Sequence, residues 1–228
     1  MTNEASGTLT AEHSDSPLAD NGVGMSAYEI AYLVKSRTGS AIRASLSALR
    51  LEPDLISDEI LAVAASSLVA RELVVLSGDE LVANGSALAV IYALTSATRW
   101  TEIGLASSEG VDGAILIEAP LISLLCQPRM LGAWLVSIEG PDAGSAQTLR
   151  RLIDAQVALR PDGGVLLVSK SLENSATLLV QHSENGDWEV AAGATSTRAE
   201  IPTRGSTSAE IDAMLAELLA VTSQENEE

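Results

Sequence analysis

Trp100-Thr-Glu-Ile-Gly-Leu-Ala-Ser107 (WTEIGLAS) is the stretch at which the chain changes from a helical to a strand-like pattern. A period of two puts alternate side chains on opposite faces of a strand. Here it separates two sets of residues: Trp100, Glu102 and Gly104 from Thr101, Ile103 and Leu105. We expect further strands over 114–118 and 133–138. Residues 121–126, which lie between two prolines, fit either a strand or a helix.

Upstream of this stretch the apolar spacing is helical. It runs from Ala27 to Leu51, with a break at Thr38-Gly39, and ends at Pro53. Ser57 can cap a second helical segment, because acidic residues follow it in the first turn. Asn84 or Ser86 can cap a third. The inward faces of these two helices are expected to carry Ile60, Ala64 and Leu68 in the first, and Ala87, Val90, Ile91 and Leu94 in the second.

A β-hairpin is predicted between those two helices. Short apolar runs at 73–76 and 81–83 flank the turn sequence Ser77-Gly-Asp-Glu80. Helices followed by a hairpin have the element order of a winged-helix module. However, residues 54–83 contain six acidic residues and one basic residue, Arg71. A DNA phosphate backbone would repel such a module, so a structural or protein-binding role is favoured.

Downstream, residues 144–158 fit a helix, and 165–169 fit a strand that follows a tight turn. Residues 177–182 and 188–192 flank Glu184-Asn-Gly-Asp187, and Asn-Gly between apolar runs is typical of a hairpin. The last helix is expected to begin with a capping box at Thr207–Glu210. Its apolar stripe follows at helical spacing and consists of Ile211, Met214, Leu215, Leu218 and Leu219.

This order of elements predicts an α+β fold with a largely antiparallel central sheet and helices packed around it. A winged-helix-like N-terminal module is one form that its first part could take. We expect a disordered tail over 1–24 and a single domain over 25–222, followed by a frayed acidic end at 223–228. Within the domain, 25–98 is helical with a hairpin and 99–222 is rich in strands.

Composition and charge narrow the possible roles. The chain has 31 acidic and 13 basic residues and a formal net charge of −18, so nucleic acid is not expected as a partner. No apolar run is long enough to cross a bilayer, and we expect no membrane association. A single cysteine and an N-terminus without a signal-peptide pattern suggest a cytoplasmic protein.

Side chains that carry chemistry are scarce. The chain has one cysteine, Cys126, within an apolar run, and two histidines, His13 and His182. The G-x-G of Asn21–Gly24 follows no strand, and Pro161–Gly164 precedes a strand rather than a helix, so neither predicts a phosphate-binding loop. We therefore expect no catalytic residues, no cofactor and no metal. Three tryptophans fall on candidate strands, where packing is the default role: Trp100, Trp134 and Trp188.

The middle of the chain resembles the EspG family of type VII secretion-associated chaperones of actinobacteria. The resemblance is carried by the order of SSLVARELV (66–74), VLSGDELVA (75–83), ALAVIYALTSATR (87–99), WTEIGLAS (100–107), GAILIEA (113–119) and GAWLVSIEG (132–140). It implies a cytosolic chaperone with a central, mostly antiparallel sheet and approximate internal two-fold symmetry. It also implies binding to the helical tip of a secreted heterodimer, without a cofactor.

We therefore expect a non-enzymatic protein that binds another protein, as a chaperone or adaptor for a type VII secretion substrate. An immunity-type or regulatory protein that masks a basic partner surface is the alternative, and strong acidity suits it. A winged-helix regulator and an enzyme without a recognisable motif are weaker hypotheses. The expected contact regions are the exposed side of the last helix and a polar loop containing Ser107, Ser108, Glu109, Val111 and Asp112.

Overall fold

The computed structural model describes residues 22–140, 144–182, 188–194 and 204–221. The elements in chain order are β1 (Val23–Ser26), α1 (Ala27–Val34), α2 (Ser40–Ala48), a 3-10 turn (Pro53–Leu55), α3 (Asp58–Ala70), β2 (Val74–Ser77), β3 (Glu80–Ala83), α4 (Gly85–Ser96), β4 (Arg99–Ser107), β5 (Gly110–Glu118), β6 (Ser123–Pro128), a second 3-10 turn (Met130–Gly132), β7 (Ala133–Glu139), α5 (Ser145–Leu159), β8 (Gly164–Lys170), β9 (Ser175–His182), β10 (Trp188–Ala194), β11 (Arg204–Ser206) and α6 (Ser208–Val221).

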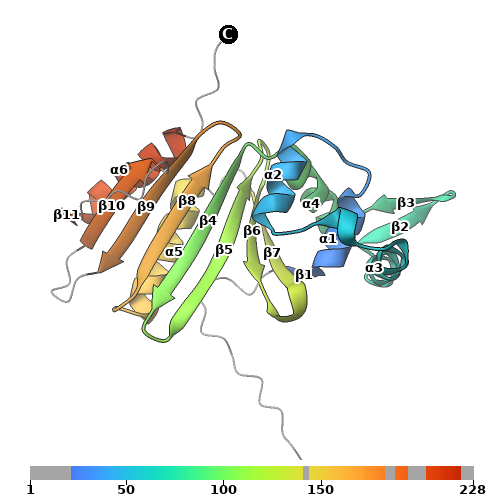
Figure 1. Ribbon diagram of the computed structural model, residues 1–228, viewed down its shortest axis with the longest axis horizontal. Helices are drawn as coiled ribbons and strands as arrows, with labels where there is room; N and C mark the ends of the chain where they lie inside the picture. Colours follow the sequence, from blue (N-terminus) through green and yellow to red (C-terminus); the bar gives the residue numbers. More distant parts are fainter. Residues whose placement is uncertain (1–21, 141–143, 183–187, 195–203, 222–228) are drawn as a thin grey trace, which may run out of the picture.

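Nine strands form one sheet in the order β1-β7-β6-β5-β4-β8-β9-β10-β11, and all of its pairings are antiparallel. Strands β4–β7 form one meander and β8–β11 another, and the two meet where β4 pairs with β8 (Figure 1). Each meander directly follows a helix, α4 or α5. The expected α+β class with a largely antiparallel sheet and surrounding helices is therefore confirmed.

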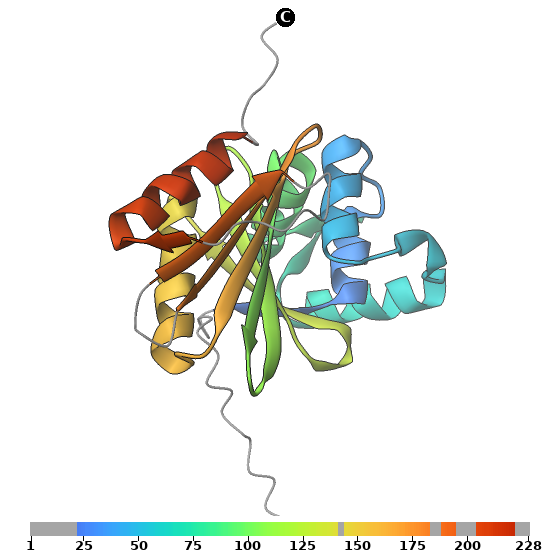
Figure 2. The same ribbon diagram turned by 60° about the vertical axis from the view of Figure 1, so that its left-hand side comes forward.

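Two groups of helices cover opposite faces of this sheet. Helices α2 and α4 lie over strands β4–β6, with α1 beside them at β1, whereas α5 and α6 lie behind β8–β10 (Figure 2). The alternation along β4 explains the split, because successive side chains point to opposite faces. Trp100 belongs to the core under α2 and α4, and Ile103 and Leu105 belong to the core under α5 and α6. One sheet therefore holds two separate hydrophobic cores.

The predicted N-terminal elements form with small shifts. The helical run from Ala27 divides into α1 and α2, and Gly39 precedes α2 with a φ of 126°, which favours glycine. The hairpin forms as β2–β3. Ile60, which was expected to face inward on α3, is instead 41% exposed, because α3 packs through Ala64, Ala65 and Leu68. On α4 the four expected residues are all buried.

The remaining boundaries differ in three places. The ambiguous segment 121–126 is a strand, β6, that begins at Ser123 and includes Pro128. Residues 1–21 of the expected tail lie outside the described residues, but Val23 and Gly24 belong to β1, which pairs with β7. The short strand β11 was not predicted. The turn at 184–187 and the acidic end at 223–228 lie outside the described residues.

Candidate functional site

Half of one sheet face is left uncovered by the described helices. It belongs to strands β4, β5, β8 and β9, on the side opposite α5 and α6. It ends at β10, where Glu189 lines the hollow but Ala191, beside Leu179, is buried. Cross-strand register places side chains from these strands next to one another: Gly104 lies beside Gly113 and Leu166, and Leu166 beside Leu179. We call this surface the open face. A shallow hollow of about 620 Å³ lies on it, and residues that line it include Gly104, Val111, Gly164, Leu166, Leu179 and Gln181.

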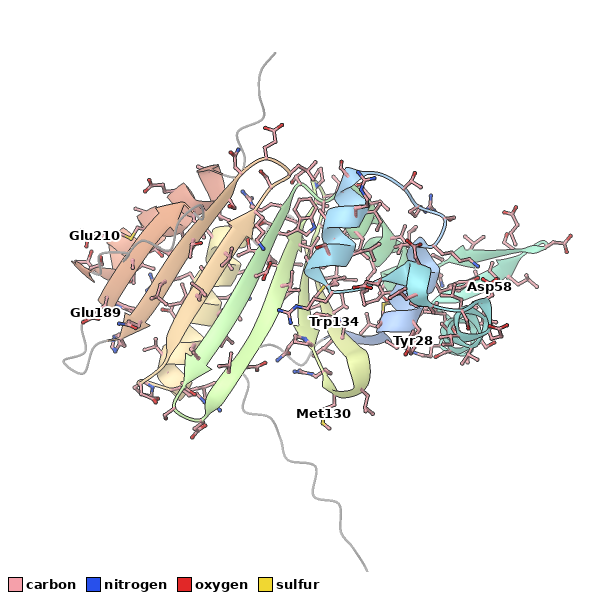
Figure 3. All side chains as sticks on the ribbon, viewed as in Figure 1. Tyr28, Asp58, Met130, Trp134, Glu189 and Glu210 are labelled. Atoms are coloured by element: carbon pink, nitrogen blue, oxygen red, sulfur yellow. The ribbon has the colours of Figure 1, made fainter. Side chains whose placement is uncertain are left out.

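The open face continues toward the first helical group. A second hollow shares Gly104, Val111 and Leu166 with the first, and it reaches Trp134 of β7 and Arg50 just beyond α2. Figure 3 shows Trp134 on the strand side of α2 and Glu189 near the far edge of the sheet. The open face therefore runs across the central strands from the second half-sheet to the rim of the first helical group.

Gly104 and Gly113, which lie in neighbouring strands, differ in whether the surrounding structure leaves room for a side chain. A Cβ on Gly113 would lie 2.8 Å from the carbonyl oxygen of Ile103, so any side chain there forces the backbone to shift. A Cβ on Gly104 would meet Leu166 at 3.8 Å, an ordinary contact, and the φ of Gly104 is not in the left-handed region. Glycine inside a strand weakens it and often marks a place where a ligand or another backbone approaches closely. Of the two glycines, Gly104 is the one with room for a side chain.

The floor of the open face is apolar and its rim is polar. Leu166 is 42% exposed and Val111 is 81% exposed, although both are large apolar residues on strands. At the rim, Lys170 Nζ lies 2.5 Å from Glu102 Oε1, and Gln181 donates a hydrogen bond to Glu189 at 2.8 Å. An apolar floor with a charged rim is the composition of surfaces that bind other proteins.

The predicted loop at 107–112 is a tight turn rather than a loop. Ser107 ends β4 and Gly110 begins β5, so only Ser108 and Glu109 lie between the strands. Ser107 and Val111 line the first hollow, and Asp112 lines the second. The structure thus brings Ser107 and Val111 to the open face, whereas Asp112 pairs with Leu105, whose side chain lies in the core on the opposite side of the sheet.

The other two residues fasten the turn to the segment before β8. The backbone N–H of Ser108 donates to Asp162 Oδ2 at 3.0 Å, and Arg160 lies 3.0 Å from Glu109. Hydrogen bonds from Ser108, first from its side chain and then from its backbone, lower the pKa of Asp162. These contacts hold the turn in place at the end of the open face.

The last helix has the expected cap and packing but does not join the open face. Thr207 Oγ1 accepts from the backbone N–H of Glu210 at 3.3 Å, and Glu210 accepts from the backbone N–H of Thr207 at 2.7 Å. The stripe residues Ile211, Leu215, Leu218 and Leu219 are buried and Met214 is partly buried. Because α6 covers the opposite face of the sheet, its outer side and the 107–112 turn cannot form one continuous surface.

The cysteine, histidine and tryptophan residues considered in the sequence analysis are held in packing or hydrogen-bond contacts. Cys126 is 1% exposed, and burial raises the pKa of its thiol to about 12. The His182 ring meets the edge of Trp188, with 4.7 Å between centroids, at the border of the open face. Trp100 is buried and donates to Ser45 Oγ at 2.9 Å. Among the described residues, no three His, Cys, Asp or Glu side chains gather closely enough to hold a metal ion.

The sequence analysis did not select Gly104, Leu166 or Leu179. A usable signal was present for the first, since Gly104 interrupts an otherwise regular strand pattern. Leu166 and Leu179 sit in apolar runs, and such runs do not say which residues another layer will cover.

No protein-family model matches the chain, and no curated protein shows significant sequence similarity to it. In the part of the chain that the structure describes, no helix is both long and apolar enough to span a membrane.

Proposed function

We propose that the protein is a non-enzymatic protein-binding protein, a chaperone or adaptor, that holds a partner on its open face. The observation that carries this proposal is the position of Gly104. It leaves the floor of an exposed apolar surface without a side chain in the central strand of the sheet, where packing does not require glycine. Such a position is suited to close approach by another chain.

The occupant that fits best is the apolar side of a helical segment. Gly104, Ala106 and Gly164 form a strip without large side chains, which we call the lane. The larger side chains of Leu166 and Val111 border it. A helix can place a ridge of side chains in such a lane while its other side remains in water. Large side chains seated on this floor would supply the fully desolvated centre that strong interfaces require.

The finer proposal concerns the partner's class. The resemblance of residues 66–140 to EspG-type chaperones leads us to propose a secreted helical protein of a type VII system as that partner. The chain would keep the apolar surface of this partner covered until export. Such a role needs no cofactor, since it consists of burying apolar surface.

A second candidate is an immunity-type or regulatory protein that masks a basic surface. The observation that favours it is the net charge of −18, together with acidic residues at the 107–112 turn. Here the partner would be a basic protein, and binding would weaken steeply with added salt. The chaperone proposal predicts weaker dependence on salt, because apolar contact dominates.

The test is affinity capture of the tagged full-length chain from its native host, with mass spectrometry of what co-purifies. Three forms are compared: wild type, Gly104→Leu, and Leu172→Ser as a control. Gly104→Leu fills the lane without a backbone clash. Leu172 is 58% exposed and lies in the β8–β9 turn, away from the open face.

We expect a stoichiometric partner on the wild type and on the control, and its loss from Gly104→Leu at unchanged thermal stability. A helical, secreted-type partner supports the chaperone, and a basic toxin or enzyme supports the alternative. A partner that stays bound to folded Gly104→Leu would contradict binding at the open face, and recovery of no partner would contradict both proposals.

A further inference from the structure

The β2–β3 hairpin exposes apolar side chains on both of its faces. Cross-strand register pairs Val75 with Val82, and Leu76 with Leu81. Their exposed fractions are 39% and 44% for the first pair, and 69% and 44% for the second. Because successive residues point to opposite sides of a strand, one pair lies on each face. Neither face of the outer hairpin is covered by another layer of the described residues.

This hairpin is a two-stranded sheet of its own, separate from the nine-stranded sheet. An isolated two-stranded hairpin is marginally stable in water, and a third strand or a packed helix is normally needed. Helix α3 packs against β2, whereas β3 lies on the side away from α3 and is exposed at Glu80, Leu81 and Val82 (Figure 1). The outer edge of β3 is therefore the position that a third strand could take.

The outer edge of β3 has backbone groups that are oriented to form hydrogen bonds with an added strand. Ser77 and Glu80 are paired across the turn, and further along Asn84 N–H donates to the carbonyl of Leu73 at 2.9 Å. Antiparallel pairs alternate between bonded and non-bonded. The pairs that contain Leu81 and Ala83 are the non-bonded ones, so the N–H and C=O groups of these two residues point outward along the free edge. An added strand could hydrogen-bond to them.

The charge around the hairpin selects the partner. Residues 72–83 contain three acidic side chains, Glu72, Asp79 and Glu80, and no basic one. Helix α3 begins with two more acidic residues. Arg71, the basic residue next to this segment in the sequence, is bound to Glu29 and to the carbonyl of Gly24. A second copy of this chain would bring more acidic residues to this acidic surface and would be repelled. A strand with a basic end would instead neutralise the acidic residues of the hairpin.

We infer that the outer edge of β3 is a docking site for an extended segment of another protein. The segment is apolar at adjacent positions beside Leu81 and Val82, and it carries Lys or Arg where it passes Asp79 and Glu80. It binds by adding a third strand to the hairpin. Figure 3 shows Asp58 of α3 and Glu189 of β10 at opposite ends of the molecule, so this site and the open face can be occupied together.

The test uses phage-displayed random peptides, selected on the purified full-length chain and then measured as synthetic peptides. We expect the selected peptides to combine adjacent apolar residues with a basic end, and to bind more weakly as salt rises. Leu81→Ser and Glu80→Lys should each weaken binding by about tenfold. Leu172→Ser is the control for the first change, and Gly104→Leu should bind the peptides as wild type does.

Backbone pairing is tested by N-methylation of alternate residues in a selected peptide. Methylation of one alternate set should abolish binding and methylation of the other should not, because only one edge of the peptide faces β3. Peptides without a basic excess, or peptides that bind folded Leu81→Ser as wild type, would overturn the inference. So would a dimer of the chain in sedimentation velocity that Leu81→Ser dissociates, since the occupant would then be a second copy. Loss of open-face partners with peptide binding retained would affect the proposed function alone.

Discussion

Glu29 is the buried charge on which the N-terminal packing depends. It completes a capping box with Ser26 at the start of α1, and its carboxylate also accepts from Ser67 Oγ at 2.8 Å and from Arg71 at 3.0 Å. Burial acts to raise its pKa. Hydrogen bonds from Ser26 and Ser67 and the charge of Arg71 outweigh burial, so the pKa of Glu29 is lowered from its ordinary value of 4.5. One side chain thus joins the start of α1 to α3.

A lowered folded-state pKa sets the direction of the pH dependence. The ionised carboxylate stabilises the folded chain above its unfolded pKa, and that stability is lost as pH falls through the folded value. We expect Glu29→Gln to lower the free energy of unfolding by about 2 kcal/mol at neutral pH. The difference from wild type should shrink as pH falls below 4.5. Urea unfolding across pH measures it, with exposed Glu52→Gln as control; a gap that widens toward acid would contradict this account.

The thiol of Cys126 should be unreactive toward thiol reagents in the folded chain. Its thiol is buried with a pKa of about 12, so little thiolate exists at neutral pH, and thiolate is the form that reacts. We expect negligible labelling by a thiol reagent under native conditions and complete labelling in denaturant. Rapid labelling of the native chain would show that β6 opens, and would contradict its central place in the first core.

At the scale of the element, β4 explains both the packing and the open face. Its alternating side chains serve two cores, Trp100 on one face and Ile103 and Leu105 on the other. Gly104 lies uncovered between Ile103 and Leu105. The neighbouring strand β5 carries Gly113 directly opposite, where glycine is required by the close approach of the Ile103 carbonyl. The two glycines face each other in the sheet and have different reasons to be there.

This difference predicts opposite responses to the same substitution. Gly104→Ala should raise the free energy of unfolding slightly, by up to about 1 kcal/mol, because alanine restricts the unfolded chain and fits the strand. Gly113→Ala should lower it by about 1–3 kcal/mol, because a Cβ must displace backbone. Thermal or urea unfolding of both variants measures the contrast. If both variants were destabilised equally, the fold itself would require glycine at position 104, and the space there would not be explained by a partner.

Short sequence patterns predicted most of the helices and strands. The elements and orientations that these patterns did not predict depend on tertiary packing. The capping box at Thr207–Glu210 and the alternation at 100–107 are visible in sequence because each depends on a few adjacent residues. Strand β1 and strand β11 are too short for a period to show, and they form because an edge of the sheet accepts them. Ile60 fits the stripe of α3, yet this helix, which packs on α1, buries Ala64, Ala65 and Leu68 and leaves Ile60 exposed.

The candidate site was only partly predictable for the same reason. Val111 and Ser107 were selected because a polar turn lies between strands, and they do border the open face. The floor consists of apolar residues such as Leu166, whose exposure depends on where α5 and α6 pack. No local pattern states which of two sheet faces a distant helix will cover.

A largely buried ion pair between Arg99 and Glu118 joins elements at the centre of the molecule. Arg99 at the start of β4 donates to both oxygens of Glu118 at the end of β5, at 2.6 and 2.8 Å. Arg99 also donates to the carbonyl of Leu219 in α6, and Ser145 at the start of α5 donates to Glu118. These contacts connect the central strands to both helices of the second group.

Removal of one member should therefore destabilise the whole fold. Arg99→Met leaves Glu118 buried without its cation, and we expect a loss of about 3–5 kcal/mol in the free energy of unfolding. Arg43→Met on the exposed side of α2 is the matched control, with an expected change within about 0.5 kcal/mol. Urea unfolding followed by circular dichroism measures both variants. A loss from Arg99→Met no larger than that of its control would contradict this role.

The most direct test of the central claim, that a protein partner sits on the open face, is site-specific photo-crosslinking in the native host. A photoreactive residue is placed at Leu166 on the open face, or at Leu159 on α5, which covers the opposite face; these residues are 42% and 49% exposed. The account predicts one discrete protein adduct at Leu166 and none at Leu159. An adduct at Leu159 alone, or equal adducts at both positions, would contradict it.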